Sequence, residues 1–284
     1  MRKTAIAEIV SKVCFLMITS RELIGEILGT FVLIIFGLSA GAVAVLFGGY
    51  QSIMQIGIAW GISVMLAVYL TRHLSNAHIN PAVTLAMVIS GRMPAKKLIP
   101  YWFAQVLGAF LGGLMLYFLF SPSIQAFEES KGIVRGTYES ITTAKMFGEF
   151  YMMPGNTAVV NLPLAIIAEA FGTFLLLLFV LGFTEDANVG RPHDTMAPVF
   201  IGISVTIIIC LIAPLTQCGI NPARDFGPRM VAWMMGWGDA AFPDNSGGFF
   251  WVYICGPFLG AVTAALFFDR IVAPALRKDG SDTI

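Results

Sequence analysis

The chain has 284 residues, 57% of them hydrophobic and only 12% charged, and its 17 basic and 17 acidic side chains leave no net charge. This composition is far from that of a soluble globular domain. The balanced charge offers no basic surface, so a nucleic-acid partner is not expected. The four cysteines are scattered without metal-ligand spacing. We therefore predict free thiols, no metal centre and no other cofactor.

Six apolar runs follow one another along the chain, at residues 24–46, 53–71, 98–120, 162–184, 196–216 and 249–271. A helix needs about 20 apolar residues to cross the hydrocarbon core of a bilayer, and each run is close to that length. The sequence therefore predicts an all-α membrane protein with six transmembrane helices in one domain, residues 1–284. Residues 121–161 are expected to form a surface linker on the extracellular or periplasmic side.

The basic residues predict the orientation, because cytoplasmic segments carry an excess of Lys and Arg. With both termini in the cytoplasm, twelve of the 17 basic residues lie inside: Arg2, Lys3, Lys12, Arg21, Arg72, Arg92, Lys96, Lys97, Arg191, Arg270, Arg277 and Lys278. The outside then holds Lys131, Arg135, Lys145, Arg224 and Arg229. This excess favours cytoplasmic termini.

An internal repeat divides the chain into two halves. The motif Glu-x-x-Gly-Thr-Phe begins at Glu26 and again at Glu169. Asn80 follows the first motif by 54 residues, and Asn221 follows the second by 52. Each copy holds three spans, so the second copy must enter the membrane from the opposite side, which makes these inverted-topology repeats. The two copies cover approximately residues 22–120 and 165–272.

Each copy also contains a short stretch that begins with Asn-Pro-Ala, at Asn80, Pro81 and Ala82 and at Asn221, Pro222 and Ala223. Asn is a favoured N-cap and Pro a favoured first helical residue, so helices are expected over 81–91 and 222–233. About ten helical residues span about 15 Å, half the hydrocarbon core. A single Asn-Pro can be an ordinary turn, but two in matching places predict re-entrant half-helices that meet near the midplane.

This meeting point predicts a pore. Helix N-termini carry partial positive charge. If backbone groups anchor Asn80 and Asn221, their amide NH2 groups can point into a lumen as donors. A neutral solute with a lone-pair oxygen can then bind briefly and leave, whereas cations and protons meet an electrostatic barrier. Irregular backbone at this depth is tolerated when it is buried or lines a cavity. We therefore predict a passive channel for small uncharged solutes.

Four charged or titratable residues in the predicted membrane region need an explanation. Arg224 lies in the first turn of a half-helix, where the dipole disfavours a cation. It either pairs with Asp225, which itself favours the helix start, or donates N–H groups into the pore. His78 is either a pH-sensing group or, as we favour, a pore-lining residue that orders the loop. Glu26 and Glu169 form a proton relay or, as their matched placement favours, brace the irregular backbone.

Two other protein classes share some of these features. A secondary transporter also uses inverted repeats and broken helices, but it needs a coupling-ion site, for which only Glu26 and Glu169 are available. An enzyme would need a nucleophile and a base. Cys218 and His78 belong to opposite repeats and have no third orienting group, so no enzymatic activity is expected. Saturating or ion-coupled uptake would favour the transporter, and passive, non-saturating flux the channel.

Over residues 22–272 the sequence resembles the aquaporin family, and within it the bacterial glycerol facilitators, or aquaglyceroporins. The matching stretches are AHINPAVTLA (77–86), KGIVRGTYES (131–140), PLTQCGINPARDFGP (214–228) and AWMMGWGDAAF (232–242). Asp225 directly after Asn-Pro-Ala-Arg, with Arg229 four residues later, is typical of the glycerol-conducting branch. The resemblance implies the aquaporin fold, a homotetramer with one pore per subunit in a bacterial inner membrane, and glycerol, related polyols and water as solutes.

The resemblance also implies a selectivity filter of four residues. Arg224 would be its donor and Trp60 its apolar wall. Where glycerol facilitators carry a second aromatic residue this chain has Cys218, and where they carry Gly it has Ile209. This set resembles the filter of plant nodulin-type channels and leaves urea, larger polyols, undissociated hydroxy acids and neutral metalloid hydroxides as alternative solutes. The pair beginning at Tyr253 replaces a Pro-Leu pair of the glycerol branch.

Overall fold

The computed structural model describes residues 18–155, 159–242 and 247–278, and no strand occurs among them. The basic residues Arg2, Lys3 and Lys12, which count toward the expected orientation, lie outside these described ranges. The long helices are α2 (Ser20–Phe47), α3 (Ile53–Ser75), α5 (Leu98–Lys131), α7 (Leu162–Thr184), α8 (Ala197–Thr216) and α10 (Gly256–Phe267). The shorter ones are α4 (Pro81–Ile89), α6 (Ile141–Ala144), α9 (Pro222–Ala232) and α11 (Ala273–Lys278).

Short 3-10 and π-helical segments lie between or next to these helices. They are η1 (Ala95–Lys97), η2 (Tyr138–Ser140), η3 (Trp233–Trp237), η4 (Gly238–Ala241), η5 (Phe250–Cys255) and η6 (Phe268–Val272). The turns η5 and η6 extend α10 at both ends, so that the last apolar helix runs from Phe250 to Arg277. The predicted arrangement of six spans and two half-helices is therefore confirmed, and the half-helices end two residues and one residue earlier than expected, at Ile89 and Ala232.

Local sequence signals start and stop the first two long helices. The Thr19 hydroxyl accepts from the backbone N–H of Glu22 (3.2 Å), and the Glu22 carboxylate accepts from the Thr19 N–H (2.9 Å). Ser52 and Gln55 form the same capping box at the start of α3. These reciprocal bonds satisfy donors that a helix start otherwise leaves unpaired. Gly48 ends α2 in the left-handed conformation, with φ of 65°.

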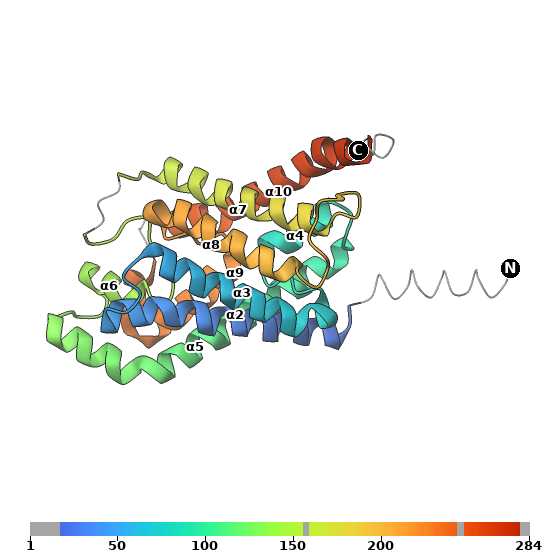
Figure 1. The fold of residues 1–284 in the computed structure, drawn as a ribbon. Helices are drawn as coiled ribbons and strands as arrows, with labels where there is room; N and C mark the ends of the chain where they lie inside the picture. Colours follow the sequence, from blue (N-terminus) through green and yellow to red (C-terminus); the bar gives the residue numbers. More distant parts are fainter. Residues whose placement is uncertain (1–17, 156–158, 243–246, 279–284) are drawn as a thin grey trace.

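The long helices lie side by side, with α2, α3 and α5 of the first repeat on one side and α7, α8 and α10 of the second repeat on the other (Figure 1). The half-helices α4 and α9 lie between them (Figure 1). The start of α2 and the end of α3 share one face of the bundle, because Arg21 donates to the carbonyl oxygen of His73 (2.5 Å). We call this the terminus-side face, since α11 also ends there, and the other the opposite face.

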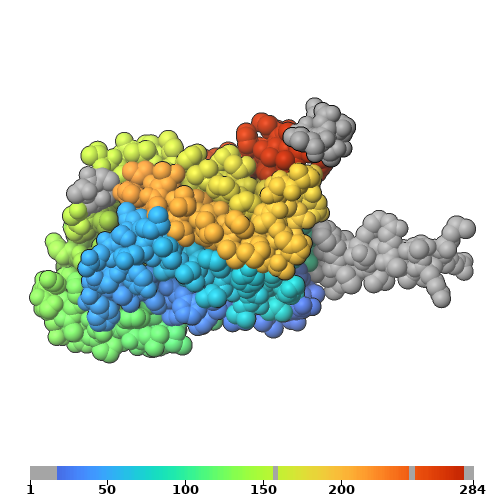
Figure 2. Space-filling view, viewed as in Figure 1, coloured from blue at the N-terminus to red at the C-terminus, as the bar shows by residue number. Residues whose placement is uncertain are grey.

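Six helices in the described ranges are long and apolar enough to cross a membrane. Their outward surfaces carry large apolar side chains at helical spacing, such as Ile58, Ile62 and Leu66 on α3 and Ile203, Ile207 and Leu211 on α8. Figure 2 shows the flank where the blue and cyan surface of α3 lies directly against the yellow and orange surface of α8. The outer flank is thus apolar and the interior is partly polar. This distribution is the reverse of that in a soluble protein, and it fits a surface that faces lipid.

Small residues allow the two repeats to approach closely where α3 crosses α8. A Cβ atom on Gly61 would lie 2.5 Å from the carbonyl oxygen of Gly202, and one on Gly202 would lie 2.5 Å from that of Gly61. Thr206 donates its hydroxyl to the Gly57 carbonyl (3.0 Å) across the same contact. Small residues at helix crossings permit this approach in membranes. The crossing closes one side of the space between the repeats.

The segment 121–161 differs from the surface linker expected from the sequence. Helix α5 continues through Pro122 to Lys131 instead of ending at residue 120. Beyond it, the segment folds inward and buries Ile141, Met146, Phe147 and Phe150 at 4% exposure or less. These apolar side chains gain by leaving water, so this part of the chain packs onto the bundle. It covers the opposite face of the molecule.

Candidate functional site

The two half-helices begin at the asparagines of the Asn-Pro-Ala motifs. Asn80 caps α4 by accepting the N–H of Ala82 on its side-chain oxygen (2.8 Å). Asn221 caps α9 in the same way, accepting from Ala223 (3.1 Å) and Arg224 (3.2 Å). Both asparagines are buried, at 4% and 6% exposure. The side-chain oxygen of each is therefore used by its own helix, and the amide nitrogen is directed away from it.

Each amide nitrogen crosses to the other repeat. Asn80 Nδ2 donates to the carbonyl oxygen of Ile220 (2.9 Å), and Asn221 Nδ2 donates to that of Ile79 (2.9 Å). The sequence led us to expect both amide NH2 groups to be free donors. The structure instead uses one hydrogen of each group to join the repeats, which leaves one hydrogen per group for a solute. Two donors are therefore still available at the meeting point, but each asparagine offers one N–H rather than a free NH2 group.

The loops that precede the half-helices have matching, unusual backbones. Left-handed φ values occur at Asn76, Ala77 and Ile79 in the first repeat and at Gln217, Cys218 and Ile220 in the second. Side chains with a Cβ rarely adopt this region, and such residues persist only where their surroundings hold them. The two loops therefore need an anchor, and the structure provides the same kind of anchor for both.

In the first repeat the anchor is Glu26. Its carboxylate accepts the backbone N–H groups of His78 (2.9 Å) and Ile79 (2.7 Å) and the side-chain amide of Gln105 (2.6 Å). In addition, Gln105 donates to the hydroxyl of Thr84 in α4 (2.8 Å). Glu26 is fully buried, where a carboxylate needs such partners. It ties the strained loop to helices α2 and α5.

In the second repeat the anchor is Glu169. It accepts the backbone N–H groups of Gly219 (2.8 Å) and Ile220 (2.6 Å) and the hydroxyl of Thr216 (2.5 Å), and it too is fully buried. The two glutamates thus accept from the same two positions relative to their asparagines, one and two residues before each. This arrangement fits a brace for the loops better than a proton relay, because the acceptors are occupied by fixed donors.

Two tyrosines make matching hydrogen bonds in the two repeats, which the sequence did not predict. Tyr101 donates its hydroxyl to the carbonyl of Ser75 (3.0 Å), and Tyr253 donates to that of Thr216 (3.0 Å). Each carbonyl belongs to the end of the helix that leads into the strained loop. Tyr253, which departs from the glycerol-branch pattern, therefore repeats in the second half what Tyr101 does in the first. The signal in the sequence was that a tyrosine lies near the start of the third span in each repeat, at Tyr101 and at Tyr253.

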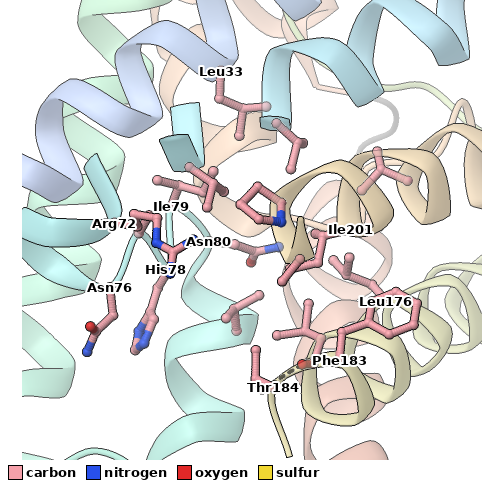
Figure 3. Close-up of a pocket in the computed structure, with 18 of the residues that line it drawn as sticks. Leu33, Arg72, Asn76, His78, Ile79, Asn80, Leu176, Phe183, Thr184 and Ile201 are labelled. Atoms are coloured by element: carbon pink, nitrogen blue, oxygen red, sulfur yellow. Dashed lines mark hydrogen bonds between the residues drawn. The ribbon is translucent and has the colours of Figure 1, made fainter. Parts of the chain in front are cut away.

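A cavity of about 520 Å³ runs between the repeats and past the paired asparagines. Figure 3 shows side chains that surround it, from Leu33 on α2 and Arg72 on α3 to Leu176 and Phe183 on α7, with Asn80 and His78 from the first loop. The His78 ring lies against Thr84 (Nδ1 to Oγ1, 3.3 Å) as well as lining the cavity. His78 therefore lines the cavity, and its role in a pore stays a prediction.

The cavity has walls of different chemistry. One set of residues is aliphatic: Val64, Val68, Leu176, Val180, Ile201 and Val205. Polar groups come from the loops and half-helix starts, including Asn80, Asn221 and Arg224. A space of this kind can hold the carbon chain of a small molecule against the aliphatic residues while its hydroxyls meet the donors.

The four residues predicted to form a filter all line this cavity: Trp60, Ile209, Cys218 and Arg224. The guanidinium carbon of Arg224 lies 4.3 Å from the centre of the Trp60 ring, a cation–π contact. A glycine makes room for the indole, because a Cβ on Gly37 would lie 2.3 Å from the Trp60 ring. All four residues therefore line one cavity, and Arg224 and Trp60 are in direct contact.

Arg224 does not form its ion pair with Asp225, the partner considered from the sequence. Asp225 pairs with Arg229 (2.8 and 2.9 Å) and accepts the backbone N–H of Glu149 (2.8 Å). Arg224 forms its ion pair with Glu149, from the segment expected to be a surface linker. Its Nη1 atom is buried and has no hydrogen-bond partner among the described residues. The aromatic residues around Glu149 in MFGEFY (146–151) were a sign that this stretch is buried.

Charged residues surround the cavity at the terminus-side face. Arg191 pairs with Asp186 (2.8 Å) and with Asp194, and the carbonyl of Asp194 accepts from Arg72 (2.6 Å). Its hydrogen bond from Arg191 lowers the pKa of the Asp194 carboxyl, so this pair stays ionised at neutral pH. Arg92 also lines the cavity here. Within residues 18–155, 159–242 and 247–278, no group of three or more His, Cys, Asp or Glu is placed to hold a metal ion.

Comparison with known proteins agrees with this geometry. The model of the family described as major intrinsic protein matches residues 3–268. The propanediol uptake facilitator of Citrobacter freundii is 36% identical over 259 residues, which cover 90% of this chain and 93% of that protein. The glycerol uptake facilitator protein of Escherichia coli K12 is 36% identical over 262 residues, covering 91% and 90%.

A solved structure shares the fold as well. The aquaglyceroporin from Plasmodium falciparum superposes with a TM-score of 0.77 and 27% identity, over 90% of this chain and 98% of that one. The family match extends over both repeats, including the two half-helices and the loops that precede them. The chain is therefore a member of the major intrinsic protein family.

Proposed function

We propose that this protein is a passive channel for glycerol, propanediol and related small neutral polyols, and that it also conducts water. Membership of a channel family and the names of its relatives support the class of solute. The observation that carries the proposal is the cavity that connects the four filter residues with the paired asparagines and has aliphatic and polar walls. Such a cavity suits flexible molecules whose hydroxyls all lie along one carbon chain.

The hydrogen-bond donors along the path determine where a solute would bind. A hydroxyl oxygen accepts from Arg224 at the filter and then from the remaining N–H of Asn80 or Asn221 at the meeting point of the half-helices. Each bond replaces one to water, so binding is weak and release is fast. The N-terminal ends of α4 and α9 and the Arg224 guanidinium make the path positive, which opposes cations and protons.

Ile209 and Cys218 are the reason to test further solutes. Together they replace the Gly and the second aromatic residue of glycerol facilitators, so the filter keeps one aromatic wall, Trp60. Urea, larger polyols, undissociated hydroxy acids and neutral metalloid hydroxides are therefore alternative solutes for the same path. We propose a channel rather than a secondary transporter or an enzyme, because the two buried glutamates are occupied by loop donors.

We further propose a homotetramer in a bacterial inner membrane with both termini in the cytoplasm. The orientation is supported by basic residues at the terminus-side face, where Arg21, Arg72, Arg92 and Arg191 lie. The assembly follows the resemblance to aquaporins. Chemical cross-linking of the purified protein would reveal four subunits, and a protease site added at residue 284 would be cleaved only in inside-out vesicles.

The test of the function is stopped-flow light scattering on proteoliposomes, with glycerol, 1,2-propanediol, erythritol, urea and lactic acid near its pKa as solutes. Leu176→Trp places a large ring in the cavity, whereas Leu164→Trp changes the outward surface of the same helix, where Leu164 is 38% exposed. We expect fast re-swelling with glycerol and propanediol, lost in Leu176→Trp and retained in Leu164→Trp. If liposomes with the unchanged protein, Leu176→Trp or Leu164→Trp all re-swell at the rate of empty liposomes, the protein is not a channel for these solutes.

A further inference from the structure

The two repeats are related by an approximate twofold axis that exchanges the two faces of the molecule. Asn80 and Asn221 are 141 positions apart, and each donates to the loop of the other repeat over 2.9 Å. Gly61 and Gly202 are also 141 positions apart, and a Cβ atom on either would lie 2.5 Å from the carbonyl oxygen of the other. A residue of α3 or α4 therefore has its counterpart 141 positions later, at the same distance from the midplane but on the other side.

The residues that line the cavity follow this relation. Val64 lines the cavity and so does its counterpart Val205, as do Ile79 and Ile220. The four filter residues also have counterparts that line the cavity. We call these counterparts the second ring, and they are Val68, Ala77, Val83 and Ile201, which correspond to Ile209, Cys218, Arg224 and Trp60. Val68 lies one helical turn before Arg72, so the second ring lies toward the terminus-side face.

The second ring offers a solute a different chemistry from that of the filter. The filter presents the guanidinium of Arg224 and the indole of Trp60. The side chains of the second ring are all aliphatic and carry no hydrogen-bonding group. The left-handed backbone positions of the two loops match, so the difference between the two rings comes from their side chains.

The helix behind the second ring adds to its apolar character. In the first repeat, Gly37 leaves room for the indole of Trp60. Its counterpart on α7 is Val180, which lies 143 positions later, the separation of the two buried glutamates. Val180 lines the cavity, as does Ile201, the counterpart of the indole. An aliphatic side chain thus occupies the place that a glycine leaves open beside the filter.

One polar side chain lies next to the second ring. His78 follows Ala77 in the first loop and lines the cavity. Its Nδ1 lies 3.3 Å from the Thr84 hydroxyl, which leaves Nε2 for a solute. A solute in the second ring can therefore bond one hydroxyl to an imidazole nitrogen. Each further hydroxyl gives up its bonds to water without gaining a side-chain partner, and an unreplaced hydrogen bond is unfavourable.

We propose that the second ring is a selectivity element that acts on the number of hydroxyl groups, and that it favours diols with an apolar end over triols of the same size. This rests on the proposed function, because it narrows the class of solute that the channel passes fastest. The filter, by contrast, supplies the N–H groups of Arg224 to hydroxyls. The two rings act in series, so a diol meets a donor at one and an aliphatic surface at the other.

The test uses two solutes with equal numbers of non-hydrogen atoms, glycerol and 1,2-butanediol, which differ by one hydroxyl. Their flux into proteoliposomes is measured by stopped-flow light scattering, and the flux into empty liposomes is subtracted. Val83→Thr and Val68→Thr each add a hydroxyl to the second ring and keep two heavy atoms on Cβ. Val64→Thr is the matched control, since Val64 lines the same cavity on the same helix as Val68 but lies outside the ring.

We expect the unchanged protein to pass 1,2-butanediol about fivefold faster than glycerol, the factor for one unreplaced hydrogen bond of about 1 kcal/mol. Val83→Thr should reduce this ratio about threefold or more by raising glycerol flux, because its hydroxyl replaces part of the lost bonding. Val64→Thr should leave the ratio unchanged. If Val83→Thr does not fold, Val68→Thr replaces it with the same expectation.

Three results would overturn the second ring while glycerol flux above that of empty liposomes still supports the channel. They are equal flux of the two solutes in the unchanged protein, an unaltered ratio in a folded Val83→Thr, and the same change of ratio in Val64→Thr. Flux no greater than that of empty liposomes in every protein would contradict both the ring and the proposed function.

Discussion

Removal of the buried carboxylate of Glu169 is the perturbation whose magnitude the structure defines best. In Glu169→Ala three donors lose their acceptor: the N–H groups of Gly219 and Ile220 and the hydroxyl of Thr216. Each buried donor left unpaired costs about 1–3 kcal/mol, so the three together give about 3–9 kcal/mol if nothing rearranges. Such a loss is a large part of the net stability of most domains.

The loop is expected to rearrange rather than bear this cost. Cys218 and Ile220 are held at φ of 72° and 43°, a region that costs about 1–3 kcal/mol for residues with a Cβ. Without the carboxylate these residues can return to ordinary backbone conformations. The carbonyl of Ile220, which accepts from Asn80 (2.9 Å), would move with them. We therefore expect glycerol flux to be lost in Glu169→Ala, together with a lower thermal unfolding midpoint.

The assay is circular dichroism of the purified protein in detergent during heating, together with proteoliposome flux. Glu169→Gln should lie between the unchanged protein and Glu169→Ala, because the amide keeps one acceptor oxygen but turns an NH2 group toward the loop donors. Glu129→Ala is the control, since this glutamate lies on the exposed surface of α5. A Glu169→Ala variant that unfolds at the same temperature as the control and conducts glycerol at the same rate would show that Glu169 does not anchor the loop.

Three further predictions concern the filter. Cys218→Ser should abolish block of flux by mercurials, since Cys218 lines the cavity, whereas persistent block would direct attention to Cys210. Cys218→Phe should narrow the filter and reduce erythritol flux more than glycerol flux in the same stopped-flow assay; equal losses would contradict its place at the constriction. Gly37→Ala should displace the Trp60 ring and lower glycerol flux, while Gly41→Ala should not, because a Cβ there meets nothing within 4 Å. Equal flux in the two alanine variants would show that Trp60 tolerates the added methyl group.

The arrangement of helices could be predicted from the sequence because it depends on local signals. Apolar length sets the six spans, and the Asn-Pro pairs at Asn80 and Asn221 fix where the half-helices start. The internal repeat then predicted that both motifs meet, since matching segments of inverted repeats enter from opposite faces. The four filter positions needed the family resemblance, because Trp60 and Ile209 lie on helices with no local mark of a pore.

The contacts that join distant segments could not be predicted. The bond from Asn80 to Ile220 spans 140 residues, and no local pattern selects a carbonyl as its acceptor. The segment after α5 was expected to be a surface linker, whereas its aromatic residues are buried and bring Glu149 to Arg224. The sequence therefore did not point to the acidic partner of Arg224.

The central claim is that solutes pass by diffusion along a continuous path. It is tested most directly by the uptake of radiolabelled glycerol into proteoliposomes over a wide concentration range, with and without gradients of H⁺ and Na⁺. We predict that the initial rate rises in proportion to concentration, is independent of either gradient and is lost in Leu176→Trp. A rate that saturates at low concentration, or that depends on an imposed ion gradient, would contradict the channel and favour a coupled transporter.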